Sequence, residues 1–425
     1  MTRETAGAER RVARALSMAI EQPTVAGGEL TPFLRLHAML RALFPRFFEA
    51  ARVRTVDGGA LLCCLPGKRS ARPLLFLSHL DVYPVRQGEG WRHPPFEGAV
   101  TDGYVYGRGS LDMKGHLIAL LTAAESLLEK NGRPQNDVWF AFSCDEEVRG
   151  TSMGHMCDIL LQEGVRPAFV LDEGGAVTRL ERMCVSPAAL IGVEEKGHLR
   201  MTLTDPADGD AARLLRAAEK LLRMRFQAGL TPVTLDMLAA LSPIMNGSRR
   251  LAAAHPWLCR SSLLRDLNRT VYGRSLSQTR LAISRLSGDA HRGEAAGVTF
   301  EASVLPGDSA ASMLKRMERM LARDGVLLTV EQFDEPSATS PCCGAAWDAL
   351  TTAVQVHFPG VPCVPYLLTG GSDARRMERV CPFIYRFSPF SLTASDIALM
   401  HSPNEKISVE NLVRGVAFFK QMLLA

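Results

Sequence analysis

The sequence predicts an α/β fold in which a smaller α+β domain is inserted into a larger catalytic domain. Three apolar runs, 74–77, 138–143 and 168–171, have the length of buried strands and alternate with helical patterns. A last strand at 383–387 is expected to return to the same sheet. At 425 residues the chain exceeds the size at which one core usually stops growing, so two domains are expected.

The inserted domain is expected at 197–335, which leaves a split catalytic domain at 1–196 and 336–425. Within the insert the sequence reads as strand, helix, a long mostly helical stretch, strand, helix and strand. Arginines and leucines alternate at 264–285, which would suit a partner-binding helix, but packing within the domain is favoured.

Side chains that can bind metal ions lie just after the first strand and at the end of a glycine-containing loop. His79 and Asp81 come directly after 74–77, so they would lie at the carboxyl edge of the sheet, where open α/β folds place their chemistry. Asp112 ends the glycine-containing loop 107–112 and precedes a helical pattern. Taken singly, a strand-end histidine bonded to its own turn and an aspartate that caps a helix explain these residues equally well.

Acids follow the next two strands as well. Asp145, Glu146 and Glu147 come after the second strand, and three adjacent carboxylates repel one another unless cations or hydrogen bonds compensate. Glu173 follows the third strand, and His401 lies far along the chain. Because several histidine- and acid-bearing segments would converge on one sheet edge, the sequence predicts a metal site of the kind that hydrolases use.

The segments around these residues resemble a known family. The motifs that carry the resemblance are Ser78-His79-Leu80-Asp81-Val82, Gly107-Arg108-Gly109-Ser110-Leu111-Asp112-Met113-Lys114-Gly115, Asp145-Glu146-Glu147, Leu171-Asp172-Glu173-Gly174 and Thr369-Gly370-Gly371-Ser372-Asp373-Ala374-Arg375. They are similar to the dinuclear zinc amidohydrolases and exopeptidases of the aminoacylase, carboxypeptidase S, glutamate carboxypeptidase and succinyl-diaminopimelate desuccinylase group. The carboxypeptidase S and N-acyl-amino-acid hydrolase branch is the most similar. The resemblance implies a zinc-exopeptidase-like, three-layer catalytic domain with an inserted lid domain.

The resemblance also implies a ligand set. Asp112 would bridge two zinc ions, with His79 and Glu173 on one ion and Glu147 and His401 on the other. This mixed set of imidazoles and carboxylates suits zinc, and manganese or cobalt are alternatives because selectivity depends on geometry and availability. A cis peptide bond after Asp112 is expected from the same resemblance.

Roles for three further side chains follow from the resemblance. Glu146 would be the general base, which takes a proton from the zinc-bridging water during attack on the amide and passes it to the leaving nitrogen. Asp81 would accept the second ring N–H of His79 and fix its tautomer. Arg375 would bind the free carboxylate of the substrate, with Arg376 as the competing candidate.

The lid departs from the family pattern. The family's Gly-His-Ser-Ser loop, whose histidine stabilises the oxyanion, is absent where 203–210 turns into a helix at Ala211. An Asn-Val-x-Pro segment is missing, and Ser303 stands where an arginine is usual. Neither His198 nor His291 occupies the family position, so neither is favoured as a replacement. Losing an oxyanion donor costs about 100- to 1000-fold in turnover, unless another group substitutes.

The composition of the chain argues against several classes of function. A net charge of +4 without an aromatic-studded basic stripe gives no reason to expect a nucleic-acid partner. No apolar run of membrane-spanning length and no signal segment is visible, so the chain is expected to be cytoplasmic, with no membrane partner. Ten cysteines lack C-x-x-C spacing and are expected to be reduced. A homodimer across the lid stays an open alternative.

The function expected from these features is hydrolysis of the amide bond of an N-acyl amino acid or small peptide with a free carboxylate. Two alternatives share the metal site. One is a metal-dependent amino-acid isomerase or racemase, which would not need an oxyanion histidine. The other is a non-catalytic metal-binding member of the family, which the presence of Glu146 argues against because binding alone needs no base.

Overall fold

The computed structural model describes residues 3–181, 183–205, 211–289 and 294–424. The chain divides into two compact units, one made of Met1–Gly192, Ser340–Val364 and Ser372–Ala425 and the other of Val193–Thr339 and Pro365–Gly371. The boundaries expected from the sequence placed Pro365–Gly371 in the catalytic domain, whereas the structure groups this short segment with the second unit. None of the described helices is long and apolar enough to cross a membrane.

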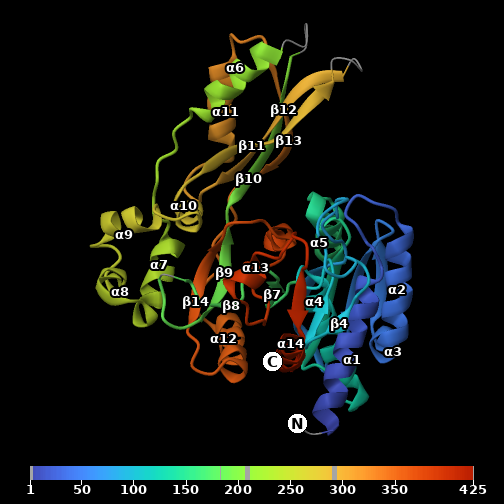
Figure 1. The fold of residues 1–425 in the computed structure, drawn as a ribbon. Coiled ribbons are helices and arrows are strands. Elements are labelled where there is room, and N and C mark those ends of the chain that lie inside the picture. Colours follow the sequence, from blue (N-terminus) through green and yellow to red (C-terminus); the bar gives the residue numbers. More distant parts are fainter. Residues whose placement is uncertain (1–2, 182, 206–210, 290–293, 425) are drawn as a thin grey trace. The chain divides into compact units, whose positions relative to one another are not determined.

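A large mixed sheet organises the first unit (Figure 1). Its strand order is β1 (Arg52–Val56), β2 (Ala60–Leu65), β6 (Asn136–Ser143), β3 (Arg69–His79), β7 (Phe169–Asp172), β15 (Ile384–Arg386), β9 (Ala188–Glu195) and β14 (Cys363–Leu368), with β8 (Val177–Thr178) paired to β9. Strand β3 is parallel to both β6 and β7, and β7 is parallel to β15. Their carboxyl ends therefore meet at one edge of the sheet.

Helices cover both faces of this sheet, because every side chain of the central strands has to be buried. The helices of this unit are α1 (Arg3–Ile20), α2 (Thr31–Leu43), α3 (Pro45–Ala50), α4 (Lys114–Glu129), α5 (Ser152–Gln162), α12 (Ala345–His357), α13 (Ala394–Ile397) and α14 (Val409–Leu423). In β3, Leu75 and Leu77 join a core with Met156 of α5, whereas Phe76 contacts Phe419 of α14 at 6.2 Å between ring centroids. The three-layer α/β class expected from the sequence is confirmed.

A second, smaller sheet leads into the last helix of this unit. It consists of β4 (Val100–Thr101), β5 (Tyr104–Tyr106) and β16 (Lys406–Ser408). Ser408 ends β16 and caps α14, because its hydroxyl accepts the backbone N–H of Asn411 at 3.2 Å. Helix α14 then packs against α1, α4 and α12.

The second unit contains the four-stranded antiparallel sheet expected of an α+β lid. Its order is β11 (Arg280–Asp289), β12 (Glu294–Val304), β10 (Gly197–Thr204) and β13 (Leu327–Asp334). Residues of α6 (Ala211–Leu222) and α11 (Ala310–Leu321) share one core with β10 and β12, in which Met201, Leu214, Phe300 and Met317 are buried. The alternation of apolar and polar residues along β10 matches a sheet with one covered face.

The middle of the second unit differs from the sequence expectation. Short helices fill the long helical stretch, namely α7 (Pro232–Leu241), α8 (Gly247–Ala254), α9 (Arg260–Leu267) and α10 (Val271–Ser277). Two strands, β11 and β12, then replace the single strand that was expected. The segment 264–285 is therefore no continuous helix. Its leucine spacing allowed a helix, but the polar side chains of β11 left the strand without a clear alternating pattern.

Candidate metal centre

Strand β3 delivers His79 to the carboxyl edge of the large sheet, where its side chain is 2% exposed. The Nδ1 atom lies 2.9 Å from the backbone carbonyl of Asp81 and 3.4 Å from its carboxylate. A carbonyl only accepts hydrogen bonds, so Nδ1 carries a proton and donates it. The nearer partner of His79 is therefore the carbonyl of Asp81 rather than the carboxylate expected from the sequence. In the neutral ring, Nε2 keeps its lone pair.

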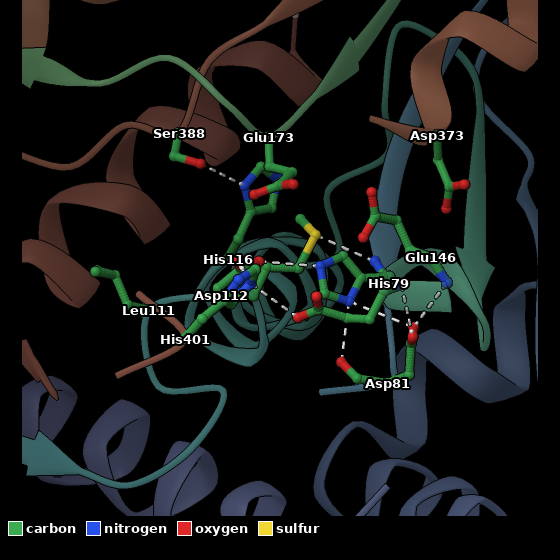
Figure 2. Close-up of polar contacts among 12 residues, drawn as sticks. His79, Asp81, Leu111, Asp112, His116, Glu146, Glu173, Asp373, Ser388 and His401 are labelled. Carbon is green, nitrogen blue, oxygen red and sulfur yellow. Dashed lines mark hydrogen bonds and ion pairs between the residues drawn. The ribbon is translucent and has the colours of Figure 1, made fainter. Parts of the chain in front are cut away.

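Asp112 lies between two histidines (Figure 2). Its Oδ1 is 3.0 Å from Nε2 of His79, and its Oδ2 is 2.9 Å from Nε2 of His401. Asp112 does not cap helix α4, whose N-cap position is Met113. The peptide bond between Asp112 and Met113 is cis, as the family resemblance implied.

Glu405 holds the loop that carries Asp112, a role that was not assigned to it from the sequence. The carboxylate is fully buried and accepts the backbone N–H groups of Leu111 at 2.8 Å and Asp112 at 3.1 Å. It also pairs with the buried guanidinium of Arg108 at 2.6 Å. Burial raises the pKa of Glu405, and the Arg108 charge opposes this effect. Only the three-dimensional contact across the chain shows this supporting role.

Two glutamates complete two groups of ligand atoms. His79, Asp112 and Glu173 form one group, and Asp112, Glu147 and His401 form the other, with the ligand atoms of each group within 4.8 Å of one another. Burial raises the pKa of both Glu147 and Glu173, and the Asp112 carboxylate raises them further. Asp112 is thus common to both groups, as a bridging ligand has to be.

Glu146 lies beside this cluster, on the short 3₁₀ turn Glu146–Val148 that follows β6. The buried Asp81 carboxylate accepts the backbone N–H groups of Glu146 at 3.2 Å and Glu147 at 3.0 Å, so Asp81 positions both glutamates as well as His79. Burial and the nearby Asp373 carboxylate raise the pKa of Glu146 well above its usual value, although His79 opposes them. Glu146 is therefore suited to hold a proton.

Asp373 and Tyr83 are two residues that the sequence did not assign to the site. Figure 2 shows Asp373 on the same side of the cluster as Glu146. Burial, followed by the Asp172 carboxylate, raises the pKa of Asp373 to about 7, and the Ser143 hydroxyl donates to it. The ring of Tyr83 stacks on His401 with 4.4 Å between centroids and 9° between planes. Tyr83 thus fixes the orientation of a half-exposed histidine.

The remaining site calls stay predictions. Arg375 and Arg376 are both half-buried on the 3₁₀ segment Asp373–Arg379, which is anchored because the backbone N–H of Ala374 donates to Asp172 at 3.0 Å. His198 lies in β10 opposite Ser303 of β12. Residues 206–210, where the sequence lacks the family's histidine loop, and His291 lie outside the described residues.

The donor set fits two divalent cations. Nε2 of His79 and Nε2 of His401 each face an oxygen of Asp112, at 3.0 and 2.9 Å, so each contact needs either a proton or a cation held by both atoms. Although burial opposes it, the Asp112 carboxylate raises the pKa of both histidines, that of His401 to about 10, so a cation would take the place of a proton at each contact. Three carboxylates and two imidazoles are the ligand types that zinc accepts. Cations would also remove the repulsion that raises the pKa values of Glu147 and Glu173.

The chain is similar to known proteins over most of its length. The model of peptidase family M20/M25/M40 matches residues 75–425. The mouse N-fatty-acyl-amino acid synthase/hydrolase PM20D1 is 30% identical over 98% of this chain and 88% of its own length, and the Dictyostelium discoideum probable carboxypeptidase S-like 2 is 25% identical over 92% and 79%. Among solved structures, human carnosine dipeptidase 1 matches with a TM-score of 0.71 at 15% identity over 98% of this chain and 96% of that one. An M20 family metallo-carboxypeptidase from Sulfolobus solfataricus gives 0.70 at 15% identity over 100% and 99%.

Proposed function

The chain belongs to peptidase family M20/M25/M40 and is a hydrolase of that family, and from this premise we propose that it cleaves the amide bond of an N-acyl amino acid or a small peptide with a free carboxylate. The names of the mouse and Dictyostelium relatives support this substrate class, since N-fatty-acyl amino acids and carboxypeptidase substrates both present a carboxylate next to the scissile amide.

The shared position of Asp112 is the observation that carries the proposal. Each of its oxygens faces a different histidine, so one carboxylate serves two cation sites. We assign His79 and Glu173 to one ion and Glu147 and His401 to the other, with zinc as the expected metal and manganese or cobalt as alternatives. When bound, two such ions supply Lewis-acid polarisation of the amide carbonyl and a lower pKa for water.

Glu146 is assigned the proton transfers. It would accept a proton from the attacking water and deliver it to the leaving nitrogen, so that a single carboxylate acts first as base and then as acid. Its raised pKa suits the second step, because burial beside Asp373 makes the protonated form stable enough to persist until the nitrogen leaves. Asp81 keeps Glu146 in place through the backbone of the same turn.

Arg375 is assigned the substrate carboxylate. A guanidinium matches two carboxylate oxygens through parallel hydrogen bonds, which would orient the scissile amide toward Glu146. Arg376, on the same 3₁₀ segment, is the alternative, and substitution of each arginine in turn separates the two. Loss of the correct arginine would raise KM for free acids but leave KM for the corresponding methyl esters unchanged.

The test is turnover of a library of N-acyl amino acids and dipeptides, each as the free acid and as the methyl ester, by metal-loaded protein in deuterated water. Release of amine from the free acids, and little from the esters, is the expected result. Uptake of deuterium at the α-carbon without amine release would replace hydrolysis by isomerisation. Bound metal without either signal would contradict the proposed substrate class.

A further inference from the structure

The turn between α8 and α9 in the second unit exposes large apolar side chains. Trp257 is 66% exposed and Leu258 is 87% exposed, and Leu251, on α8 just before the turn, is 72% exposed. Single exposed apolar residues need no explanation, but three within eight positions of one segment are the kind of feature that marks an interaction site.

The turn is held in a defined shape. The backbone N–H groups of Leu258 and Cys259 both donate to the carbonyl of His255 at 3.1 Å. Across the turn, Arg249 of α8 pairs with Asp266 of α9 at 2.7 Å. Helix α8 packs on α7 and α9, and α9 packs on α10, as Figure 1 also shows for this end of the unit. Trp257 and Leu258 are therefore exposed on a turn that backbone hydrogen bonds, an ion pair and helix packing hold in place.

The segment that contains this turn is rich in positive charge. The segment 247–285 contains eight arginines and one acid, Asp266, which already pairs with Arg249. Arg250, Arg260 and Arg265 are exposed. Arg260 and Arg265 donate to the backbone carbonyls of Leu230 at 2.8 Å and Ser261 at 3.4 Å, and a carbonyl does not neutralise the positive charge of a guanidinium.

We propose that the turn 255–259, together with Leu251, Arg250, Arg260 and Arg265, docks onto an anionic lipid surface. Tryptophan and leucine side chains favour the boundary between headgroups and acyl chains, and arginines are attracted to acidic headgroups. Tryptophan and arginine also occur at protein interfaces, but eight arginines against one acid give this segment the charge of a single sign that an anionic bilayer attracts. The docking surface is independent of the metal centre, and it adds a binding property to the proposed hydrolase.

The experiment is co-sedimentation of metal-loaded, full-length protein with phosphatidylcholine vesicles that contain either no or 30% phosphatidylserine, at about 0.05 and 0.15 M salt. The double variant Trp257→Ser/Leu258→Ser should weaken binding to the phosphatidylserine vesicles by about tenfold or more. Arg250→Gln/Arg260→Gln should weaken it several-fold and reduce its salt dependence.

Matched controls separate docking from general surface effects. Val185 and Val356 are exposed to a similar degree, 60% and 59%, and Val185→Ser/Val356→Ser should bind vesicles as the unaltered protein does. Hydrolysis of a water-soluble substrate should be the same in all these variants. Equal binding to neutral and acidic vesicles, or binding that survives Trp257→Ser/Leu258→Ser, would overturn the proposal. So would a dimer that this variant converts to monomer, because a second copy would then cover the turn.

Discussion

Asp112 is the residue on which both proposed cation sites depend, because it belongs to both groups of candidate ligand atoms. Asp112→Asn is therefore expected to lower bound metal from two equivalents toward none, whereas Glu147→Gln should leave one. Metal per chain, measured by elemental analysis after dialysis, checks this difference. Asp102→Asn is the control, since Asp102 is an exposed turn residue with φ of 52°, a backbone angle that asparagine also tolerates. Two equivalents retained by Asp112→Asn would exclude Asp112 as the bridge.

The sequence was also most informative about individual residues of the candidate site. Residue type and position after a buried strand were enough to single out His79, Glu147 and Glu173, because parallel strands bring their carboxyl ends together. The same reasoning could not single out Glu405 or Tyr83, because their roles depend on contacts between segments far apart in the sequence. The role of Arg375 stays a prediction for the same reason.

At the scale of elements, the loop 107–112 is kept in place by Glu405 from the other end of the chain. Glu405→Gln would leave the buried Arg108 without its carboxylate, and we expect it to lower the free energy of unfolding by about 3–5 kcal/mol. Urea denaturation measures this change. Glu410→Gln is the matched control, because Glu410 forms only an exposed pair with Arg414 and its loss should change stability by less than about 0.5 kcal/mol. A similar effect of both substitutions would refute the supporting role of Glu405.

The connection after β7 has no space for a side chain. A Cβ at Gly175 would lie 1.9 Å from the carbonyl oxygen of Leu190 and 2.7 Å from that of Arg386. Gly175→Ala should therefore displace the segment that carries Glu173, destabilise the protein by about 1–3 kcal/mol and reduce bound metal. Thermal unfolding and metal analysis check both effects. Gly154→Ala in α5 meets no atom within 4 Å and should leave metal content unchanged while stability stays equal or rises by up to about 1 kcal/mol.

The second unit shows which elements sequence patterns could not resolve. A strand was expected at the start of the insert and corresponds to β10, one face of which is covered. Strand β11 has mostly exposed side chains and was not separated from the helical stretch before it. The absence of an apolar run of membrane-spanning length led to the expectation of no membrane partner. The length of an apolar run predicts whether a segment can cross a membrane. Docking on a membrane surface depends instead on exposed side chains, and the exposure of Trp257 and Leu258 is known only from the fold.

For the whole molecule, metal binding and folding are expected to be coupled. A chelator should lower the unfolding temperature and added zinc should restore it, because ligands that bind only the native state stabilise it, by about 2.7 kcal/mol at 100 times Kd. The pKa values of Glu147 and Glu173 are raised in the metal-free fold, so the native state holds protons that the unfolded chain releases above its ordinary glutamate pKa.

The consequence of these raised pKa values is a pH dependence. As pH rises through the interval between the unfolded and folded pKa values, these two glutamates make the metal-free protein less stable, while deprotonation favours metal binding. Calorimetry at several pH values should therefore show a gap between the metal-loaded and metal-free unfolding temperatures that widens with pH. A gap that is constant or shrinks would contradict metal binding by these carboxylates.

The most direct test of the account is steady-state hydrolysis by Glu146→Gln with its metal content measured on the same sample. If Glu146 is the general base, kcat falls by about 100- to 10,000-fold while KM and two equivalents of metal are retained. Near-normal kcat in the fully loaded variant would contradict the assignment of the proton transfers to Glu146. Loss of activity together with loss of metal would show instead that Glu146 supports the metal centre.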